Sequence, residues 1–233
     1  TNALVKHAWD LFLETEENSG YIHALKTGFI NSKIEDSARK RDLNIAMGRE
    51  VLTGTNNYPN QSEFSPEDLD QNVAFPKSKV DSTIPVLKKY RGAEAFEKLR
   101  LQTEKSEKTP VVFLLTYGSL NWRKARAGFS YGFFSCAGYK LIDNNGFESI
   151  DAGIHPAIEK NADIIVFCSS DEEYADINSA HTELISNKAI PVIAGYPKDY
   201  KEQLESFGIE KFIHVKSNLL DELNNFQERL NIH

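Results

Sequence analysis

Five short apolar segments recur between Pro110 and the C-terminus, and each is followed by a stretch with helical spacing. The segments are 111–116, 139–143, 163–168, 190–195 and 211–214. Their continuous apolar character is typical of strands that are buried on both faces of a sheet. Because every strand is followed by a helix, neighbouring strands must run parallel, with right-handed crossovers. The alternation therefore predicts a doubly wound α/β fold with a five-stranded parallel sheet in the order 2-1-3-4-5.

The helices of this half are expected at 121–137, 149–160, 172–187, 200–207 and 219–230. An open parallel sheet of this size is flavodoxin-like. Such sheets bind ligands beyond the carboxyl ends of their strands, where the strand order reverses. The loops that meet at this edge would be 116–121, 168–171 and 194–197. We expect any ligand-binding residues of the chain in these three loops.

The first half of the chain differs in character. Residues 1–50 read as an α-helical segment, in which Leu4, Ala8, Leu11 and Phe12 form one wide apolar face. Residues 51–109 read as a long linker that ends in a connecting helix at 93–107. Within the linker, 51–54 predicts a short strand, and 65–68 predicts one helical turn with proline at its first position. We therefore divide the chain into 1–50, 51–109 and 110–233.

The composition argues against two classes of partner. The chain of 233 residues has a formal net charge of −7. An acidic chain gains nothing from the counterion release that drives nucleic-acid binding. No apolar run is long enough to cross a bilayer. The two cysteines, Cys136 and Cys168, lie in apolar segments, as buried, reduced thiols do in cytoplasmic proteins. We expect a cytoplasmic protein with no nucleic-acid or membrane partner.

Three kinds of flavodoxin-like domain require different residues in these loops. A phosphoacceptor domain needs an acidic pair after the first strand to hold a divalent cation, and 116–119 offers no carboxylate. A flavin-binding domain needs a hydroxyl-rich loop that cradles a phosphate at a helix N-terminus, which Gly118 and Ser119 meet only loosely. A cobalamin-binding domain needs an Asp-x-His-x-x-Gly signature, in which the histidine ligates cobalt and the aspartate orients it.

Several short motifs carry a resemblance to a known family. In the first half they are Ala8-Trp9-Asp10-Leu11-Phe12, Leu52-Thr53-Gly54-Thr55-Asn56 and Tyr58-Pro59-Asn60. In the second half they are Ala125-Arg126-Ala127, Ala137-Gly138-Tyr139, Gly146-Phe147-Glu148-Ser149 and Cys168-Ser169-Ser170-Asp171. With these motifs in this order, the chain resembles methylmalonyl-CoA mutases over nearly its whole length. The resemblance is strongest to the small, non-catalytic subunits of the heterodimeric bacterial enzymes.

That resemblance implies a role for the chain. Subunits of this family carry a large (β/α)8 barrel before this region. The chain is therefore expected to be a C-terminal fragment that begins with the last barrel helix, with Trp9 and Phe12 exposed. The intact enzyme isomerises methylmalonyl-CoA and succinyl-CoA with adenosylcobalamin, which the catalytic large subunit holds. The resemblance implies that this chain pairs with the large subunit in a supporting role and binds no cofactor itself.

The cobalamin signature is replaced at all three of its positions. Its aspartate, histidine and glycine correspond to Asn121, Arg123 and Arg126. A guanidinium has no lone pair to offer cobalt, and Arg126 fills space where the tail of the cofactor would pass. The serines and the glycine of the family's strand ends persist as Ser169, Ser170 and Gly195. We therefore expect these six residues to line a vestigial groove, with no catalytic residue, no cofactor-binding residue and no metal ligand.

Two alternatives stay open. A corrinoid whose own base ligates cobalt needs no protein ligand, although Tyr117, Trp122 and Arg126 crowd the groove. Trp122 either fills the vacated groove or simply packs on its neighbours. A flavodoxin-like module could instead bind a flavin or another phosphate through Gly118 and Ser119.

Other chemically active side chains have plainer interpretations. His155 and Glu159 lie four residues apart on one predicted helix face, but no third metal ligand has an obvious place. His181 and Glu183 are expected to be solvated on a polar helix. The run Arg39-Lys40-Arg41 is expected to be a solvated helix face.

Overall fold

The computed structural model describes residues 1–66, 69, 84–87, 89–186 and 188–232. The chain forms two compact units. One is built from Thr1–Asn44 and Glu67–Glu94, and the other from Ile45–Pro66 and Ala95–His233. The helical turn predicted at 65–68 falls partly outside the described residues, at 67 and 68. The second unit holds the whole α/β domain.

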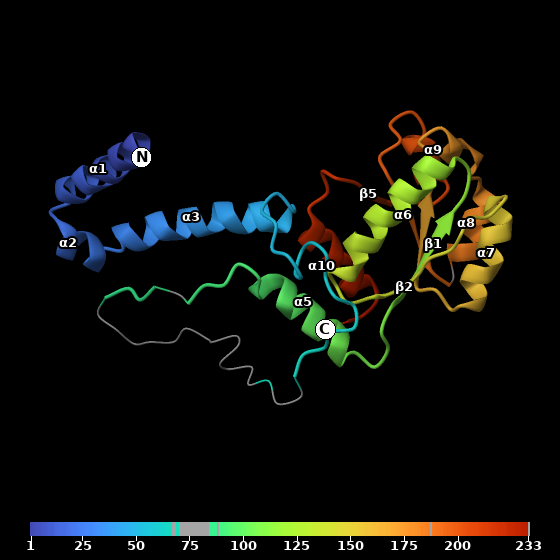
Figure 1. The fold of residues 1–233 in the computed structure, drawn as a ribbon, viewed down its shortest axis with the longest axis horizontal. Helices are drawn as coiled ribbons and strands as arrows, with labels where there is room; N and C mark the ends of the chain where they lie inside the picture. Colours follow the sequence, from blue (N-terminus) through green and yellow to red (C-terminus); the bar gives the residue numbers. More distant parts are fainter. Residues whose placement is uncertain (67–68, 70–83, 88, 187, 233) are drawn as a thin grey trace. The chain divides into compact units, whose positions relative to one another are not determined.

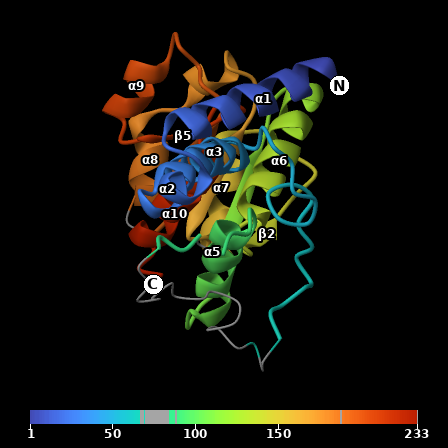
Figure 2. The ribbon, with the colours of Figure 1, turned by 90° about the vertical axis from the view of Figure 1, so that its left-hand side faces the viewer.

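Three helices lie within the described residues 1–46 (Figure 1 and Figure 2). They are α1 (Asn2–Glu17), α2 (Tyr21–Lys26) and α3 (Phe29–Ala46). The Lys33 ammonium lies 2.6 Å from the Glu14 carboxylate and joins α3 to α1. Trp9 and Phe12 are 59% and 49% exposed, which confirms the prediction that these apolar side chains of α1 are exposed.

Five parallel strands form the sheet of the second unit. They are β1 (Val111–Thr116), β2 (Lys140–Ile142), β3 (Ile164–Cys168), β4 (Ile190–Ala194) and β5 (Lys211–Ile213). The strands are hydrogen-bonded in the order β2-β1-β3-β4-β5, which confirms the flavodoxin-like topology. Val112 pairs with Ile164, and Ile164 pairs with Ile190. The strand order reverses between β1 and β3, so the switch point lies where the sequence predicted it.

Helices cover both faces of this sheet (Figure 1). One face packs against α5 (Glu94–Lys105), α6 (Leu120–Ser135) and α10 (Leu219–Arg229), and the other against α7 (Ile150–Glu159), α8 (Ser179–Ser186) and α9 (Lys201–Ser206). Successive strand residues alternate between the two cores. Val112 and Leu114 belong to the core with α6, whereas Phe113 and Leu115 belong to the core with α7. The two cores bury β1 and β3 almost completely, which explains why these strands are continuously apolar.

The prediction of a single helix at 172–187 is wrong. This stretch forms two helices, a 3-10 helix, η1 (Glu173–Asp176), and α8, with Ile177 in extended backbone between them. Asn178 begins the second helix, because its Oδ1 accepts a hydrogen bond from the His181 N–H at 3.2 Å. Ile177 is 1% exposed, so the break turns an apolar side chain into the core.

The short strand predicted at 51–54 is also wrong. In this stretch Thr53 forms an isolated bridge with Asn57. The buried amide of Asn56 closes the segment into a turn. Its Oδ1 accepts the Leu52 N–H at 2.7 Å, and its Nδ2 donates to Ile45 O at 2.9 Å. These local bonds offer the backbone an alternative to strand pairing.

Candidate functional site

The three predicted loops meet at the carboxyl ends of the strands, where hydrogen bonds join them. Ser169 Oγ lies 2.9 Å from Tyr117 O and joins the loop after β3 to the loop after β1. The hydroxyl of Tyr174, in η1, lies 2.7 Å from Ala194 O at the end of β4. These loops form one connected structure, which we call the carboxyl edge.

The carboxylate of Glu173 ties two of these loops together. Oε1 accepts the Ser119 N–H at 2.9 Å, while Oε2 accepts the Ser170 N–H at 3.1 Å and the Ser169 hydroxyl. The carboxylate lies where a side chain at position 118 would stand, so a methyl group built there would clash with it. Gly118 has φ of +68°. Both the backbone and the close approach therefore require glycine.

Hydrogen bonding sets the charge of Glu173. Partial burial raises the pKa of this carboxyl, but hydrogen bonds from Ser169, Ser170 and Ser119 outweigh burial and hold the pKa below its ordinary value of 4.5. Glu173 is therefore an anion at neutral pH. It accepts a hydrogen bond at the N-terminus of α6, where backbone amides and the helix dipole favour negative charge.

The hydroxyl of Tyr174 is buried between the ends of β3 and β4. The residue is 0% exposed. Its hydroxyl lies 2.7 Å from Ala194 O and 3.1 Å from Phe167 O, and it accepts the Ser169 N–H at 3.1 Å. Burial holds the pKa of this phenol well above its usual range. The phenol stays neutral and bridges two adjacent strand ends.

Arg126 closes the space between α6 and the ends of β3 and β4. Its Nη2 donates to Asp171 Oδ1 at 2.8 Å. Its guanidinium covers Gly195, where an added methyl group would lie 3.0 Å from it. Trp122 is 51% exposed, with its ring centroid 5.5 Å from the same guanidinium. Trp122 therefore packs on Arg126, and it is Arg126 that fills the space above Gly195.

Arg123 and Asn121 lie apart from this group, on the first turn of α6. The Arg123 guanidinium covers Gly146, where an added methyl group would lie 2.5 Å from it. Its Nη1 donates weakly to Gly118 O at 3.4 Å. Asn121 is exposed. The two residues expected at the histidine and aspartate positions of the cobalamin signature therefore face different surroundings.

Ser169 and Ser170, the other predicted groove residues, are 0% and 5% exposed. Their backbone N–H groups donate to the Tyr174 hydroxyl and the Glu173 carboxylate, and the Ser169 hydroxyl lies within hydrogen-bond distance of Glu173 Oε2 and Tyr117 O. The structure therefore places Ser169, Ser170, Gly195 and Arg126 at the ends of β3 and β4, whereas Arg123 contacts the loop after β1 at Gly118 O and Asn121 is exposed.

Each described titratable group that builds this edge already has a protein partner or a buried environment. Glu173 is bound by three donors, and Arg126 is paired with Asp171. Burial first, then the charges of Asp176 and Glu173, raises the pKa of Tyr117 far above its usual range. The arrangement is suited to holding loops together rather than to proton transfer.

Other candidate residues lie on helix surfaces. His155 and Glu159 are exposed on α7, and the run 39–41 is exposed on α3. Within the described ranges, no three His, Cys, Asp or Glu side chains are placed to hold a metal ion. No helix in the described part of the chain combines the length and the apolar character that a membrane span requires.

His181 corrects a prediction, because it is 7% exposed rather than solvated. Its Nδ1 accepts the Asn178 N–H at 3.3 Å, and its Nε2 lies 3.3 Å from the Asp151 carboxylate. The start of α8 and the packing of α7 bury a side chain that composition had placed on a polar face. Glu183 is exposed, as predicted.

Cys136 and Cys168 are buried free thiols, as predicted. Burial is the main cause that raises the pKa of each to about 12. Cys168 Sγ lies 3.9 Å from Ser130 Oγ inside the core. Thiols that stay protonated and buried are poor nucleophiles near neutral pH.

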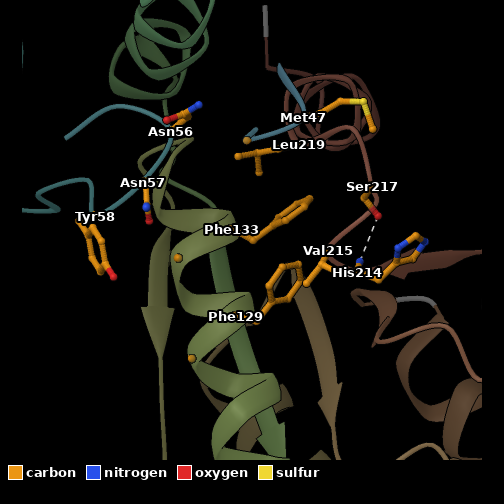
Figure 3. Close-up of a pocket in the computed structure, with 13 residues that line it drawn as sticks. Met47, Asn56, Asn57, Tyr58, Phe129, Phe133, His214, Val215, Ser217 and Leu219 are labelled. Carbon is orange, nitrogen blue, oxygen red and sulfur yellow. Dashed lines mark hydrogen bonds between the residues drawn. The ribbon is translucent and has the colours of Figure 1, made fainter. Parts of the chain in front are cut away.

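A separate cavity of about 450 Å³ lies beside α6, between the segment that follows α3 and the loop that joins β5 to α10. Figure 3 shows Phe129 and Phe133 projecting from α6 on the side of Leu219. The His214 N–H donates to Ser217 Oγ at 3.0 Å, and the imidazole ring points away from the two phenylalanine rings. None of the predicted groove residues lines this cavity, which offers mainly apolar walls.

Sequence reasoning missed Glu173 and Tyr174, which hold the carboxyl edge together. The sequence carries one weak signal for them, since both lie within a few residues of Ser169 and Ser170, which follow β3. Their partners at 117–119 and 194 lie far away along the chain, so only the folded sheet brings them within reach.

Comparison with known proteins identifies the family. The model of the methylmalonyl-CoA mutase family matches residues 1–115. The methylmalonyl-CoA mutase small subunit of Porphyromonas gingivalis is 43% identical over 232 residues, which is 100% of this chain and 37% of that relative. The probable small subunit of Mycobacterium tuberculosis is 27% identical over 239 residues, covering 99% of this chain and 35% of that relative.

The large subunit of the Porphyromonas gingivalis enzyme is also similar, at 31% identity over 83 residues, which is 35% of this chain and 12% of that relative. The match to the Porphyromonas small subunit includes the whole of this chain, but the chain spans only a little over a third of that subunit's length. The motifs, the flavodoxin-like sheet and these matches agree, and the chain belongs to the methylmalonyl-CoA mutase family.

Proposed function

We propose that this chain serves as part of the small, non-catalytic subunit of a heterodimeric methylmalonyl-CoA mutase in the cytoplasm. The assembled enzyme interconverts methylmalonyl-CoA and succinyl-CoA, and adenosylcobalamin on the large subunit supplies the radical chemistry. In this proposal the α/β domain of the present chain supports the large subunit and binds no cofactor. The small-subunit relatives that match the whole chain support this role.

One observation carries the proposal: the Arg126 guanidinium, anchored by Asp171, covers Gly195. In a cobalamin-binding domain the position of Arg126 is a glycine that leaves room for the tail of the cofactor. Arg123 takes the place of the cobalt-ligating histidine, and a guanidinium has no lone pair to donate. The side chains present at this edge therefore do not fit cobalamin.

The phosphate-binding alternative meets a different obstacle. Glu173 already accepts the Ser119 and Ser170 N–H groups with a carboxylate that stays ionised at neutral pH. A phosphate approaching the same amides would meet a like charge at close range. This contact favours the supporting role over a flavin- or phosphate-binding module.

Titration with two corrinoids tests the proposal. Adenosylcobalamin and hydroxocobalamin are added in turn to the purified chain, visible absorption is recorded, and the mixture is separated by gel filtration. We expect no colour to elute with the protein at concentrations well above micromolar. Co-elution with an unchanged base-on spectrum would contradict the proposal and favour a corrinoid carrier. A yellow chromophore that purifies with the chain would favour a flavin-binding module.

Co-expression tests whether the chain pairs with a large subunit. The small subunit and a large subunit of this family are produced together and separated by gel filtration. Co-elution in one complex supports the proposal, whereas separate elution of two folded subunits would contradict it.

A further inference from the structure

The contact between Glu173 and the loop at Gly118 indicates a role for this carboxylate at the carboxyl edge. This inference does not depend on the proposed function. We propose that the Glu173 carboxylate is a built-in strap. It takes the place that an external oxyanion would occupy at the N-terminus of α6, and in doing so it holds the loops after β1 and β3 closed against each other.

The donors that Glu173 binds come from both loops. The Ser119 N–H belongs to the loop after β1, and the Ser170 N–H and Ser169 hydroxyl belong to the loop after β3. Backbone amides at a helix N-terminus, together with hydroxyls, are the groups that bind phosphate and carboxylate oxygens in proteins. The site is therefore built like an anion site, and its anion is a side chain of the same chain.

The shape of the loop after β1 fits this occupant. Gly118 has φ of +68°, and the space where its side chain would stand is taken by the Glu173 carboxylate. Any side chain at this position would push the carboxylate off the Ser119 amide. The absence of a side chain at 118 is thus what lets the strap reach the helix.

The backbone of Glu173 is held on both sides, so the carboxylate is positioned before it makes its contacts. The Glu173 N–H donates to Ser170 Oγ at 3.3 Å, and its carbonyl accepts the Tyr117 hydroxyl at 3.2 Å. The next residue, Tyr174, is fixed by its buried hydroxyl. Little conformational freedom is lost when the strap closes, which favours the closed state.

The neighbouring residue provides a matched control. Glu172 precedes Glu173 in the same loop and carries the same charge, but its side chain is exposed. Removing the Glu173 carboxylate should leave two backbone N–H groups without their acceptor, whereas removing the Glu172 carboxylate should leave both loops unchanged.

Amide hydrogen exchange read by NMR tests the strap. We expect the Ser119 and Ser170 amides to exchange at least about tenfold faster in Glu173→Ala than in the unaltered chain, because a hydrogen bond to a charged acceptor is lost at each. The Leu114 and Val166 amides, in β1 and β3, should keep their rates in both proteins. Glu172→Ala should exchange like the unaltered chain at all four positions.

Chemical rescue then tests whether the position vacated by the Glu173 carboxylate binds an anion. Sodium formate supplies a free carboxylate, and sodium chloride at the same ionic strength is the control. We expect formate, and not chloride, to slow exchange at Ser119 and Ser170 in Glu173→Ala, with no effect on the unaltered chain. If the Ala variant does not fold, the same measurements on Glu173→Ser, which also vacates the position of the carboxylate, take its place.

Two outcomes would overturn the proposal. In the first, the Ser119 and Ser170 amides exchange no faster in the Glu173 variant than in Glu172→Ala, so the carboxylate holds nothing closed. In the second, exchange is faster but formate does not slow it, so the position does not select an anion.

Discussion

Arg126 Nη2 lies 2.8 Å from Asp171 Oδ1, and this ion pair links α6 to the loop after β3. The two side chains are 21% and 46% exposed, so solvent and salt screen their attraction. We expect a coupling free energy of about 0.5–1 kcal/mol in a double-mutant cycle of Arg126→Met and Asp171→Asn. Urea denaturation of the four proteins measures it, and the coupling should shrink in high salt. Additive single substitutions at low salt would contradict the prediction.

Tyr174 should contribute more to stability than a surface tyrosine. Tyr174→Phe removes a buried hydroxyl that contacts Ala194 O, Phe167 O and the Ser169 N–H. We expect the free energy of unfolding to fall by about 1–3 kcal/mol, because buried polar groups are left without partners. Tyr196→Phe is the control, since Tyr196 is 42% exposed, and it should change stability by less than about 0.5 kcal/mol. Equal urea midpoints for the two variants would refute this account.

Substituting alanine for glycine should change the stability of the domain in opposite directions at two helical positions. A methyl group at Gly153, in α7, would lie 2.7 Å from Leu115 Cγ and 2.9 Å from the Phe147 ring, whereas nothing lies within 4 Å of one at Gly128 in α6. Gly153→Ala should destabilise the domain by about 1–3 kcal/mol through overpacking. Gly128→Ala should stabilise it by about 0.5–1 kcal/mol through helix propensity. Thermal unfolding measures both, and shifts of the same sign would contradict the packing described for α7.

The buried thiols should make stability depend on alkaline pH. The pKa of Cys168 rises from 9.0 to about 12 in the folded state, chiefly through burial. A raised folded-state pKa means that this stabilisation is complete below the unfolded pKa near 9 and is lost as the pH rises toward 12. We expect the free energy of unfolding to fall with pH above 9, and to fall less steeply in Cys168→Ala. Identical slopes would show that the thiol does not contribute.

The order of the strands could be predicted because it depends on a pattern that local sequence carries. Each buried strand is a run of apolar residues with a helical stretch after it, and the handedness of the crossovers leaves few topologies. The helix at 172–187 could not be predicted as two elements from periodicity alone. Its break depends on Ile177 entering the core and on Asn178 beginning a new helix. The start of a new helix at Asn178 did leave a trace in the sequence, since Asn is a common N-cap residue.

The candidate site was predicted in part. Arg126 was expected to fill space at the carboxyl edge, and the structure places its guanidinium over Gly195. Glu173 escaped prediction because its function at this edge depends on Ser119, which lies 54 residues earlier in the chain. A carboxylate five residues after a strand end is common and has no distinctive pattern. His181 was misjudged for a similar reason, because its burial depends on α7.

The two contacts that cover Gly118 and Gly195 bear on how this edge could be redesigned. Under the proposed correspondence with the cobalamin signature, Arg123→His would supply a potential cobalt ligand, yet Arg126 would still cover Gly195 and Glu173 would still hold the Ser119 amide. Designing a cobalamin carrier on this scaffold would therefore require substitutions on separate elements, at Arg126 in α6 and at Glu173 in η1, besides the new ligand.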